Sequence, residues 1–334
     1  MRVSVVVPTY KRGWALPYSL SSLVEQTIPA DEVVVVLKPS KDGSEGIIDG
    51  FRDRLPIRLV IQKKGFVAEA MEMGIKNAYG DIILFIDDDA IAEKGWVAKY
   101  LTLFEKLNDA GGITGLIYQT SIKGGKQINN FNHTTYPQTK KVFSKLTGFY
   151  GRPLDLYRGY VNYISKSGFL ICKCERKRKN REGIILDSVF VGANMGFRKE
   201  AIEDCPLVRF FKRSRKGYSY ESFLAYWARR KGYNTYAVLE PLVAPIVRHI
   251  SHTQRLTGLS SKNPFFDKFW FGYDVLMNYF RYRSLGADVS FLRYVVAALA
   301  FIRKDLPPRL AALSYTLLTL PRYLREICEQ TDQM

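Results

Sequence analysis

The first third of the chain alternates short, continuously hydrophobic runs with amphipathic stretches. Four runs rich in β-branched residues have the length and composition of strands that are buried on both faces. They lie at 3–7, 33–37, 57–61 and 82–86. Between them, apolar side chains recur at helical spacing. One helix is expected over 67–77, and another carries Leu16, Leu20, Leu23 and Val24 on its apolar face.

This alternation predicts an α/β fold, in which a parallel sheet is covered by helices on both faces. In such sheets, ligands bind beyond the carboxyl ends of the strands. The residues that directly follow each predicted strand are therefore the first candidates for a functional site.

The later part of the chain has a different pattern. The segment 111–190 is rich in Gly, Tyr, Asn and Lys and shows weak periodicity. Helical patterns return after residue 196, including a helix predicted over 222–231 that Gly232 closes. From about residue 264 the sequence is again helical, with aromatic residues interleaved with arginines. We therefore expect the α/β domain to be followed by a helical C-terminal extension.

The charge balance narrows the kinds of partner. The 334 residues include 50 Lys and Arg against 32 Asp and Glu, which gives a net charge of +18. Such an excess favours nucleic acid, an anionic membrane surface or a phosphate-bearing substrate. The hydrophobic share of 47% is typical of a folded globular chain and excludes disordered and collagen-like classes.

The cysteine content and the lengths of the apolar runs indicate where in the cell the protein is located. Four cysteines with three histidines suit neither a disulfide framework nor a zinc site, so we expect reduced thiols in a cytosolic protein. The apolar runs at 294–302 and 310–321 are shorter than the roughly 20 residues that cross a bilayer. We expect no membrane-spanning helix, and association with a membrane surface stays open.

Three consecutive carboxylates, Asp87, Asp88 and Asp89, follow the fourth predicted strand. Their mutual repulsion is costly unless a cation offsets it. Carboxylate oxygens suit Mg²⁺ or Mn²⁺, which proteins usually hold together with substrate phosphates. The alternative is an acidic loop at a helix N-terminus. Position and clustering favour the metal and phosphate site.

Several motifs occur in the order found in one enzyme family. They are VSVVVPTYKR at 3–12, SSL at 21–23, the segment 65–81, the three aspartates as a D-x-D motif, VGANMGFR at 191–198, and Glu221 followed by RRKGY at 229–233. Together they make residues 1–250 resemble the family 2 glycosyltransferases, which are inverting nucleotide-sugar enzymes of the GT-A fold. The resemblance implies a Rossmann-like, mostly parallel sheet flanked by helices. It further implies a nucleotide-sugar-binding half at 1–110 and an acceptor-binding half of the same domain at 111–255, and we place the helical extension at 256–334.

The resemblance also assigns residues to the donor and the metal. The residues that would contact the donor are Pro8, Thr9, Tyr10, Arg12, Asp87 and Asp88. Asp89, with Asp87, would hold a divalent cation (Mn²⁺ or Mg²⁺) on the diphosphate. His249 is expected near the same metal or phosphate, and His252 is a weaker candidate. A purely structural, hydrogen-bonded role remains open for both histidines.

Glu221 aligns with the general base of the family, which deprotonates the acceptor hydroxyl as it attacks the anomeric carbon. One such displacement inverts the anomeric configuration. A carboxylate suffices because the proton leaves as the new bond forms. Alternatively, Glu221 only favours the N-terminal dipole of its helix, and Asp187 or Asp204 is the base.

One position departs from the family pattern. Family members usually carry an aspartate pair after the second strand that reads the donor base, whereas this chain has Lys38 there. Either Asp42 takes over that role, or Lys38 meets a phosphate or a different base. A uridine donor and a guanosine donor are both compatible with the sequence.

The basic and aromatic segments suggest a location for the protein. Basic clusters at 173–181 and 209–216 join a tail whose helix over 288–303 places apolar residues on one face: Leu292, Val295, Val296 and Leu299. This pattern is typical of a protein that lies on an anionic membrane, and a lipid-phosphate acceptor would suit it as well as a glycan. Packing against the catalytic domain or in a dimer is the alternative. We expect a cytoplasmic protein that associates peripherally with the inner face of the cell membrane.

Two other classes compete with the transferase. A nucleic-acid-binding protein would explain the net charge, but we find no RNA-binding signature or zinc finger, so we expect no nucleic-acid partner. A catalytically degenerate GT-A protein, acting as a membrane scaffold or partner subunit, would explain the loss of the base-reading aspartate.

Overall fold

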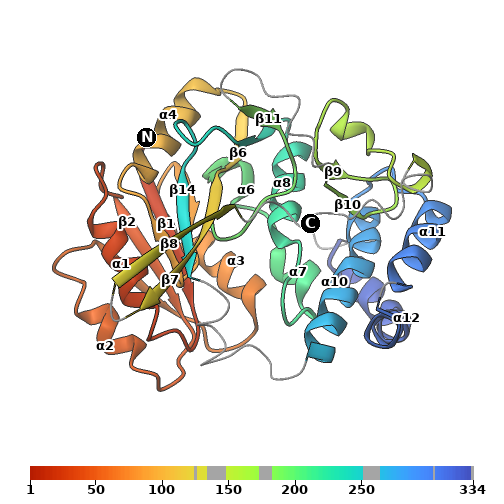
Figure 1. Ribbon diagram of the computed structural model, residues 1–334. Helices are drawn as coiled ribbons and strands as arrows, with labels where there is room; N and C mark the ends of the chain where they lie inside the picture. Colours follow the sequence, from red (N-terminus) through yellow and green to blue (C-terminus); the bar gives the residue numbers. More distant parts are fainter. Residues whose placement is uncertain (124–125, 134–147, 173–182, 251–263, 304, 332–334) are drawn as a thin grey trace.

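The structure is a computed structural model that describes residues 1–123, 126–133, 148–172, 183–250, 264–303 and 305–331. Its centre is an eight-stranded sheet (Figure 1). In sheet order the strands are β11 (Ile184–Leu186), β13 (Asn234–Val238), β6 (Ala110–Thr114), β12 (Met195–Arg198), β4 (Ile82–Phe85), β1 (Val3–Thr9), β2 (Glu32–Leu37) and β3 (Ile57–Ile61).

The four strands expected from the N-terminal hydrophobic runs are all present and pair in parallel. Strand β1 pairs with β2 and β4, and β2 pairs with β3. Strand β12 runs antiparallel between β4 and β6, so the sheet continues from the first part of the chain into the second. The predicted α/β class with a mostly parallel sheet is confirmed. Strands β6 and β11, which lie in the segment with weak periodicity, were not predicted.

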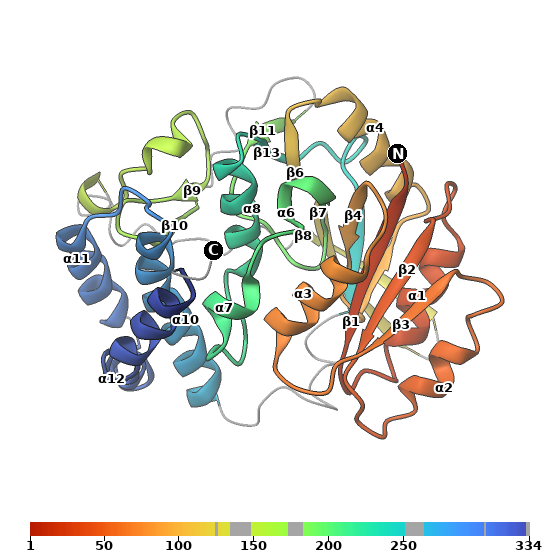
Figure 2. The ribbon, with the colours of Figure 1, turned by 180° about the vertical axis from the view of Figure 1, so that it is seen from behind.

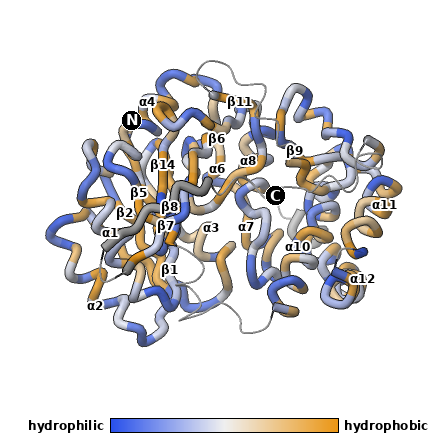
Figure 3. The backbone as a smooth tube through the Cα atoms, in the orientation of Figure 1, coloured by the Kyte–Doolittle hydropathy of each residue, from blue (hydrophilic) through white to orange (hydrophobic). Residues whose placement is uncertain are grey.

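Alternate residues of the central strands point to opposite faces of the sheet, and both faces are buried. Val6 and Val34 contribute to one core, together with helices α3 (Val67–Asn77) and α8 (Tyr220–Arg230). Val5 and Val33 contribute to the other, together with helices α1 (Leu16–Val24) and α4 (Trp96–Lys106). The central strands are largely hydrophobic along their length for this reason (Figure 3). Three shorter helices complete the two layers: α2 (Ser44–Asp49), α6 (Lys199–Ile202) and α7 (Leu207–Phe211).

A second, four-stranded sheet is built mainly from later parts of the chain. Its order is β5 (Ala90–Ala92), β14 (Ile246–Ile250), β7 (Leu116–Lys123) and β8 (Lys126–His133). Strand β5 directly follows the three aspartates and pairs antiparallel with β14, placing His249 opposite Ala90. This pairing brings residue 249 to the carboxyl end of β4. A small sheet of β9 (Tyr163–Ile164) and β10 (Leu170–Ile171), preceded by the 3₁₀ helix η2 (Asp155–Tyr157), lies closer to the C-terminal helices.

The helical C-terminal extension is confirmed. It consists of α10 (Pro264–Ser284), α11 (Phe291–Ile302) and α12 (Leu306–Thr331), which lie together on the side of α7 and α8 (Figures 1 and 2). The middle helix starts three residues later than expected. Within the described residues, none of the helices combines the length and the hydropathy needed to span a membrane.

Candidate active site

The aspartate run and His249 form one compact cluster. Asp87, Asp88 and Asp89 occupy the turn between β4 and β5, and the backbone amide of Ile250 donates to the carbonyl of Asp89 (2.9 Å). The Nε2 atom of His249 lies 3.0 Å from Asp89 Oδ1 and 3.3 Å from Asp87 Oδ2. One ligand atom from each of Asp87, Asp89 and His249 lies within 4.8 Å of the other two.

This donor set fits a divalent cation. Two carboxylates and one imidazole converge from two strands, and both Asp89 and His249 are buried. Burial lowers the pKa of His249, but its hydrogen bonds to Asp87 and Asp89 and their negative charge outweigh this effect and raise the pKa to about 9. Carboxylates of this kind suit Mn²⁺ or Mg²⁺.

Arg12 approaches the same aspartates from the loop after β1. Its Nε atom lies 3.6 Å from Asp89 Oδ2 and 3.7 Å from Asp88 Oδ1. Burial and the charge of Asp89 raise the pKa of Asp88 well above its usual value, and the charge of Arg12 opposes that shift. Asp88 thus lies inside the protein against Arg12, with 8% of its surface exposed.

The expected donor-binding residues gather where β1, β2 and β3 end. Thr9 is buried, Pro8 is partly buried beside Val36 of β2, and Tyr10 is 45% exposed. The Nζ atom of Lys38 donates to the carbonyl of Gly65 (2.6 Å) and lies over the rings of Tyr10 and Phe66, at 5.2 and 5.3 Å from their centroids. Lys38 therefore lies beside the aromatic ring that the sequence assigned to the donor.

The side chain of Asp42 accepts hydrogen bonds in two neighbouring loops. Its Oδ2 atom accepts a hydrogen bond from the amide of Gly13 (2.9 Å), and its Oδ1 atom accepts from Ser40 Oγ (3.0 Å) and the amide of Ser44 (3.3 Å). Burial raises the pKa of Asp42, but these hydrogen bonds outweigh it and leave the pKa below its usual value. Oδ2 of Asp42 thus ties the loop after β2 to the loop after β1, while Oδ1 bonds within the loop after β2.

Glu221 lies in the first turn of α8, next to the glycine-containing segment that precedes β12. A Cβ atom built on Gly192 would lie 2.9 Å from Glu221 Oε1 and 2.4 Å from the hydroxyl of Tyr220. Burial raises the pKa of Glu221 to about 8, and the charge of Asp87 contributes, although the backbone amides of Glu221 and Gly192 oppose the shift. The charge of Asp87 is thus felt at Glu221, the residue predicted as the base. Gly192 belongs to the family-like motif at 191–198, but the sequence did not show that this motif lies against Glu221.

The two alternative bases have other partners. Asp187 is fully buried and accepts hydrogen bonds from Asn162 Nδ2 (2.5 Å) and the amide of Val189 (2.7 Å). Asp204 forms an ion pair with Lys231 Nζ (2.5 Å). His252 and the basic run 173–181 lie outside the described residues.

The side chain of Asn194, in the motif at 191–198, forms hydrogen bonds to three parts of the fold. Its Oδ1 atom accepts from Trp96 Nε1 (2.8 Å) and the hydroxyl of Tyr100 (2.9 Å), and its Nδ2 atom donates to the carbonyls of Leu116 and Pro245 (2.8 and 2.9 Å). Because Asn194 is fully buried, it joins α4 to the second sheet. It also holds the chain that contains Gly192.

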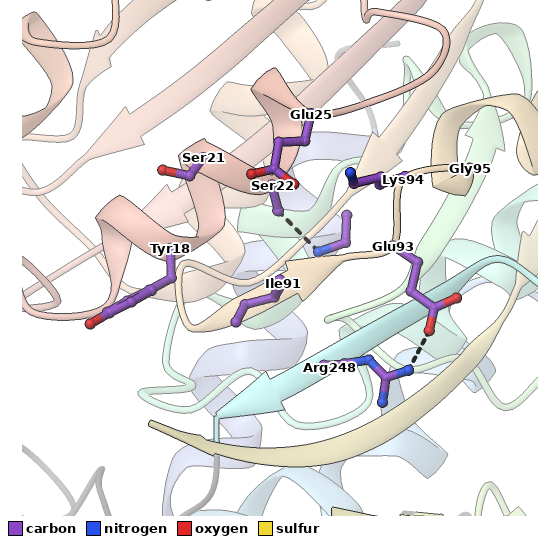
Figure 4. A pocket seen from close by; sticks show the side chains of 10 residues that line it. Tyr18, Ser21, Ser22, Glu25, Ile91, Glu93, Lys94, Gly95 and Arg248 are labelled. Atoms are coloured by element: carbon purple, nitrogen blue, oxygen red, sulfur yellow. Dashed lines mark hydrogen bonds and ion pairs between the residues drawn. The ribbon is translucent and has the colours of Figure 1, made fainter. Parts of the chain in front are cut away.

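A pocket of about 530 Å³ lies between α1, β5 and β14 (Figure 4). Tyr18, Glu25 and Lys94 line it, and Arg248 forms an ion pair there with Glu93 (Nη2 to Oε1, 2.6 Å). Side chains of successive strand residues point to opposite faces, so Arg248 points away from the side on which His249 meets the aspartates. The pocket is therefore distinct from the metal cluster.

The chain belongs to glycosyl transferase family 2, because the model of that family matches residues 4–205. The match contains β1 to β4 and the aspartate cluster, and it ends before Glu221 and the C-terminal helices.

Each of the curated relatives matches less than half of the chain. The uncharacterized glycosyltransferase YfnE of Bacillus subtilis is 30% identical over 151 residues, which cover 44% of this chain and 36% of that protein. The glucosyl-dolichyl phosphate glucuronosyltransferase of Haloferax volcanii is 29% identical over 121 residues, which cover 35% of this chain and 38% of that protein. The chain spans at most about half of the length of the curated relatives it matches, and as little as 12% of one of them.

Solved structures share the fold over nearly the whole chain. The complex of S. aureus TarS with UDP-GlcNAc has a TM-score of 0.51 at 16% identity and covers 98% of this chain and 79% of that one. GalNAc-T7 with UDP, GalNAc and Mn²⁺ has a TM-score of 0.51 at 14% identity and covers 91% of this chain and 54% of that one. At this level of identity the similarity confirms the GT-A fold.

Proposed function

We propose that the protein is a metal-dependent, inverting glycosyltransferase that moves a sugar from a nucleotide-sugar donor to an acceptor hydroxyl. The observation that carries the proposal is the convergence of Asp87, Asp89 and His249 on one point, with Glu221 within electrostatic reach of Asp87. A structural acidic loop does not need an imidazole from a distant strand or a carboxylate of raised pKa beside it. The likeness to GalNAc-T7, solved with UDP and Mn²⁺, supports this chemistry.

In the proposed reaction, Glu221 accepts the proton of the acceptor hydroxyl while the acceptor oxygen attacks the anomeric carbon. The bond from that carbon to the diphosphate oxygen breaks, and the nucleoside diphosphate leaves with the electron pair. Attack from the side opposite the leaving group inverts the anomeric configuration. A divalent cation held by Asp87, Asp89 and His249 would offset the negative charge that develops on the diphosphate.

For the donor, we propose UDP- or GDP-sugars, bound where β1, β2 and β3 end. Tyr10 offers an exposed ring for a base to stack on, and Lys38 lies directly over that ring. An ammonium group attracts phosphate and carbonyl oxygens, so Lys38 can contact either the donor phosphates or a base carbonyl. The fold that the chain shares with TarS, solved with UDP-GlcNAc, supports a nucleotide sugar as donor.

For the acceptor, we propose a glycan or a lipid-linked phosphate. Arg215 and Lys216 are exposed in the segment that leads to Glu221, where they can meet the phosphates of a lipid-linked acceptor. The similarity to a relative named as a glucosyl-dolichyl phosphate glucuronosyltransferase supports this choice.

We also propose that the C-terminal helices touch an anionic membrane surface. Leu292 and Leu299 of α11 are each 65% exposed, and Leu318 of α12 is 80% exposed, while the opposite side of α11 packs in the core through Tyr294 and Ala298. Arg322 and Arg325, which are exposed on α12, and the net charge of +18 complement an anionic surface.

Sedimentation with lipid vesicles tests the membrane proposal. Vesicles that contain phosphatidylglycerol should retain the protein, pure phosphatidylcholine vesicles should not, and Leu299→Ser with Leu318→Ser should reduce binding severalfold. Equal binding of the double variant would contradict the proposal. Self-association that the same substitutions abolish would instead assign this face to a second copy of the chain.

Thermal unfolding with a panel of UDP-, GDP- and dTDP-sugars, with and without Mn²⁺, tests the main proposal. A ligand that binds the folded state raises the melting temperature. We expect a metal-dependent rise with one nucleotide, followed by transfer of its sugar. A protein that binds no donor and transfers no sugar would instead be a degenerate scaffold.

A further inference from the structure

Asp274 and Arg281 form a buried ion pair on α10, and Asp274 contacts the segment that precedes Glu221. Arg281 Nη2 is 2.8 Å from Asp274 Oδ1, and the two side chains are 1% and 0% exposed. Arg281 also donates from Nε to the carbonyl of Phe210 (3.1 Å), and its guanidinium lies over the ring of Phe211, 3.9 Å from the centroid. The pair thus joins the C-terminal extension to α7 and the residues that follow it.

The second oxygen of Asp274 holds the next stretch of chain. Asp274 Oδ2 accepts hydrogen bonds from Ser214 Oγ (2.7 Å) and from the amide of Tyr218 (3.1 Å). Ser214 Oγ in turn accepts from the amide of Gly217 (2.7 Å), and the carbonyl of Gly217 accepts from the amide of Tyr220 (3.1 Å). A continuous series of hydrogen bonds therefore runs from α10 to the first residue of α8, next to Glu221.

The backbone of this segment needs such support. Gly217 and Ser219 both have positive φ, +64° and +75°, and the left-handed region is unfavourable for a serine. A Cβ atom on Gly217 would lie 2.2 Å from Val67 Cγ1 of α3, so α3 packs closely against the segment at this glycine. Such conformations persist only where surrounding contacts hold them.

A buried ion pair is weak evidence of stabilisation, because removing two charges from water is costly. Here Oδ1 of Asp274 accepts a hydrogen bond from Arg281, and Oδ2 accepts one from Ser214, in the segment before Glu221. The arrangement therefore points to a role in orientation. The matched family region ends at residue 205, so it contains neither α10 nor this segment.

We propose that Asp274, through Ser214, is a positioning residue for the transfer reaction: the C-terminal extension holds the segment 214–218 so that Glu221 meets the acceptor hydroxyl. The proposal rests on the proposed function, in which Glu221 is the base. Asp274 and Ser214 touch neither donor nor acceptor in this account, and they act through the backbone that starts α8.

Ser214→Ala tests the proposal because it cuts the link and leaves the Asp274–Arg281 pair in place. The matched control is Ser165→Ala, which removes another fully buried serine hydroxyl, one that donates to the carbonyl of Phe169 (2.9 Å). We expect Ser214→Ala to lower kcat about tenfold, with an unchanged donor KM and an unchanged thermal shift by nucleotide and Mn²⁺. Ser165→Ala should keep kcat within twofold of the wild type.

Ser214→Thr, which retains the hydroxyl, should recover most of kcat, and melting temperatures of all variants identify any that fail to fold. If Ser214→Ala unfolds, the comparison of Ser214→Thr with Ser214→Cys, a weaker hydrogen-bonding group, replaces it and should show the same loss of kcat. Equal kcat for Ser214→Ala and the control, or a loss that comes entirely from a raised donor KM, would overturn the inference.

Glu221→Gln separates this inference from the proposed function. If Glu221→Gln keeps the wild-type rate, the base assignment fails, and the positioning proposal fails with it. If Glu221→Gln loses turnover while Ser214→Ala behaves as the control, only the positioning proposal fails. If Ser214 acts through Glu221, Ser214→Ala should add little to the loss in a Glu221→Gln background.

Discussion

His249 Nε2 lies 3.0 Å from Asp89 Oδ1, and this contact depends on the antiparallel pairing of β5 with β14. The pairing places residue 249 opposite residue 90, and a shift of one residue would turn the imidazole to the other face of the strand. The candidate metal site is therefore a product of strand register as much as of the aspartate run.

Asp89→Asn should weaken Mn²⁺-dependent nucleotide binding at least tenfold. Asp89 is buried and supplies one of the three converging ligand atoms, and an amide is a much poorer ligand for a divalent cation than a carboxylate. Isothermal titration with UDP and GDP, each with Mn²⁺, measures the effect. The control is Asp49→Asn, a change at an exposed carboxylate on α2. Metal-dependent binding of wild-type strength in Asp89→Asn would contradict the assignment.

Glu221→Gln should lower kcat by about 10² to 10⁴, the usual contribution of a general base, while donor binding is retained. The amide has nearly the same shape but cannot accept the proton of the acceptor hydroxyl. Steady-state kinetics with the donor found in the thermal screen give kcat and KM separately. A rate equal to that of the wild type would show that another group is the base.

Gly192→Ala should reduce kcat with little change in donor affinity. The added methyl group would lie 2.9 Å from Glu221 Oε1 and 2.4 Å from the Tyr220 hydroxyl, so the carboxylate must move. Gly46→Ala on α2 is the matched control, because a Cβ atom there meets nothing within 4 Å. Kinetics and melting temperatures of both variants separate a displaced base from a general loss of folding. Full activity of Gly192→Ala would argue that the position of Glu221 is not critical.

The buried carboxyl of Asp187 predicts a measurable pH dependence of stability. Burial raises its pKa from 3.8 to about 8 in the folded protein. Between these values the unfolded chain binds fewer protons than the folded one, so the free energy of unfolding falls as pH rises, by up to about 1.4 kcal/mol per pH unit.

Asp187→Asn should remove the contribution of residue 187 to the fall of the free energy of unfolding with rising pH, because an amide does not titrate. Urea unfolding at pH 5, 6, 7 and 8 measures this free energy for the wild type and the variant. Asp204→Asn, at a largely exposed carboxylate whose pKa is lowered, should leave the slope between pH 5 and 8 in place. Identical slopes for the wild type and Asp187→Asn would mean that Asp187 is ionised in the folded protein.

Local patterns predicted much of the fold. The run 57–61 and the helix over 67–77 coincide with β3 and α3, because strand-type composition and helical spacing are both local signals. The aspartate run was placed correctly at the carboxyl end of a strand for the same reason. The expected burial of the run 57–61 on both faces is wrong, because β3 lies at the edge of the sheet and its residues are only partly buried or exposed. Strands such as β11 are short and lie where the periodicity is weak. They are strands because they pair with neighbouring strands, and their local sequence does not indicate this.

The roles of individual site residues were harder to predict. The sequence placed Asp42 and Lys38 in the same loop region, but only the folded loops show that Asp42 holds Gly13 while Lys38 lies over Tyr10. Likewise, nothing local to Asp274 indicates that its side chain reaches Ser214. Such contacts join residues that are far apart in the sequence.

The sequence by itself determined the α/β class, the helical extension, the cationic charge and the place of the aspartates, since these follow from hydrophobic periodicity and residue chemistry along neighbouring positions. Only the tertiary structure decided which groups meet: His249 with Asp89, Glu221 with Gly192, and α10 with the segment before Glu221. The physical reason is that strand register and helix packing are set by burial and hydrogen bonding summed over the whole domain, and no local stretch of sequence contains that sum.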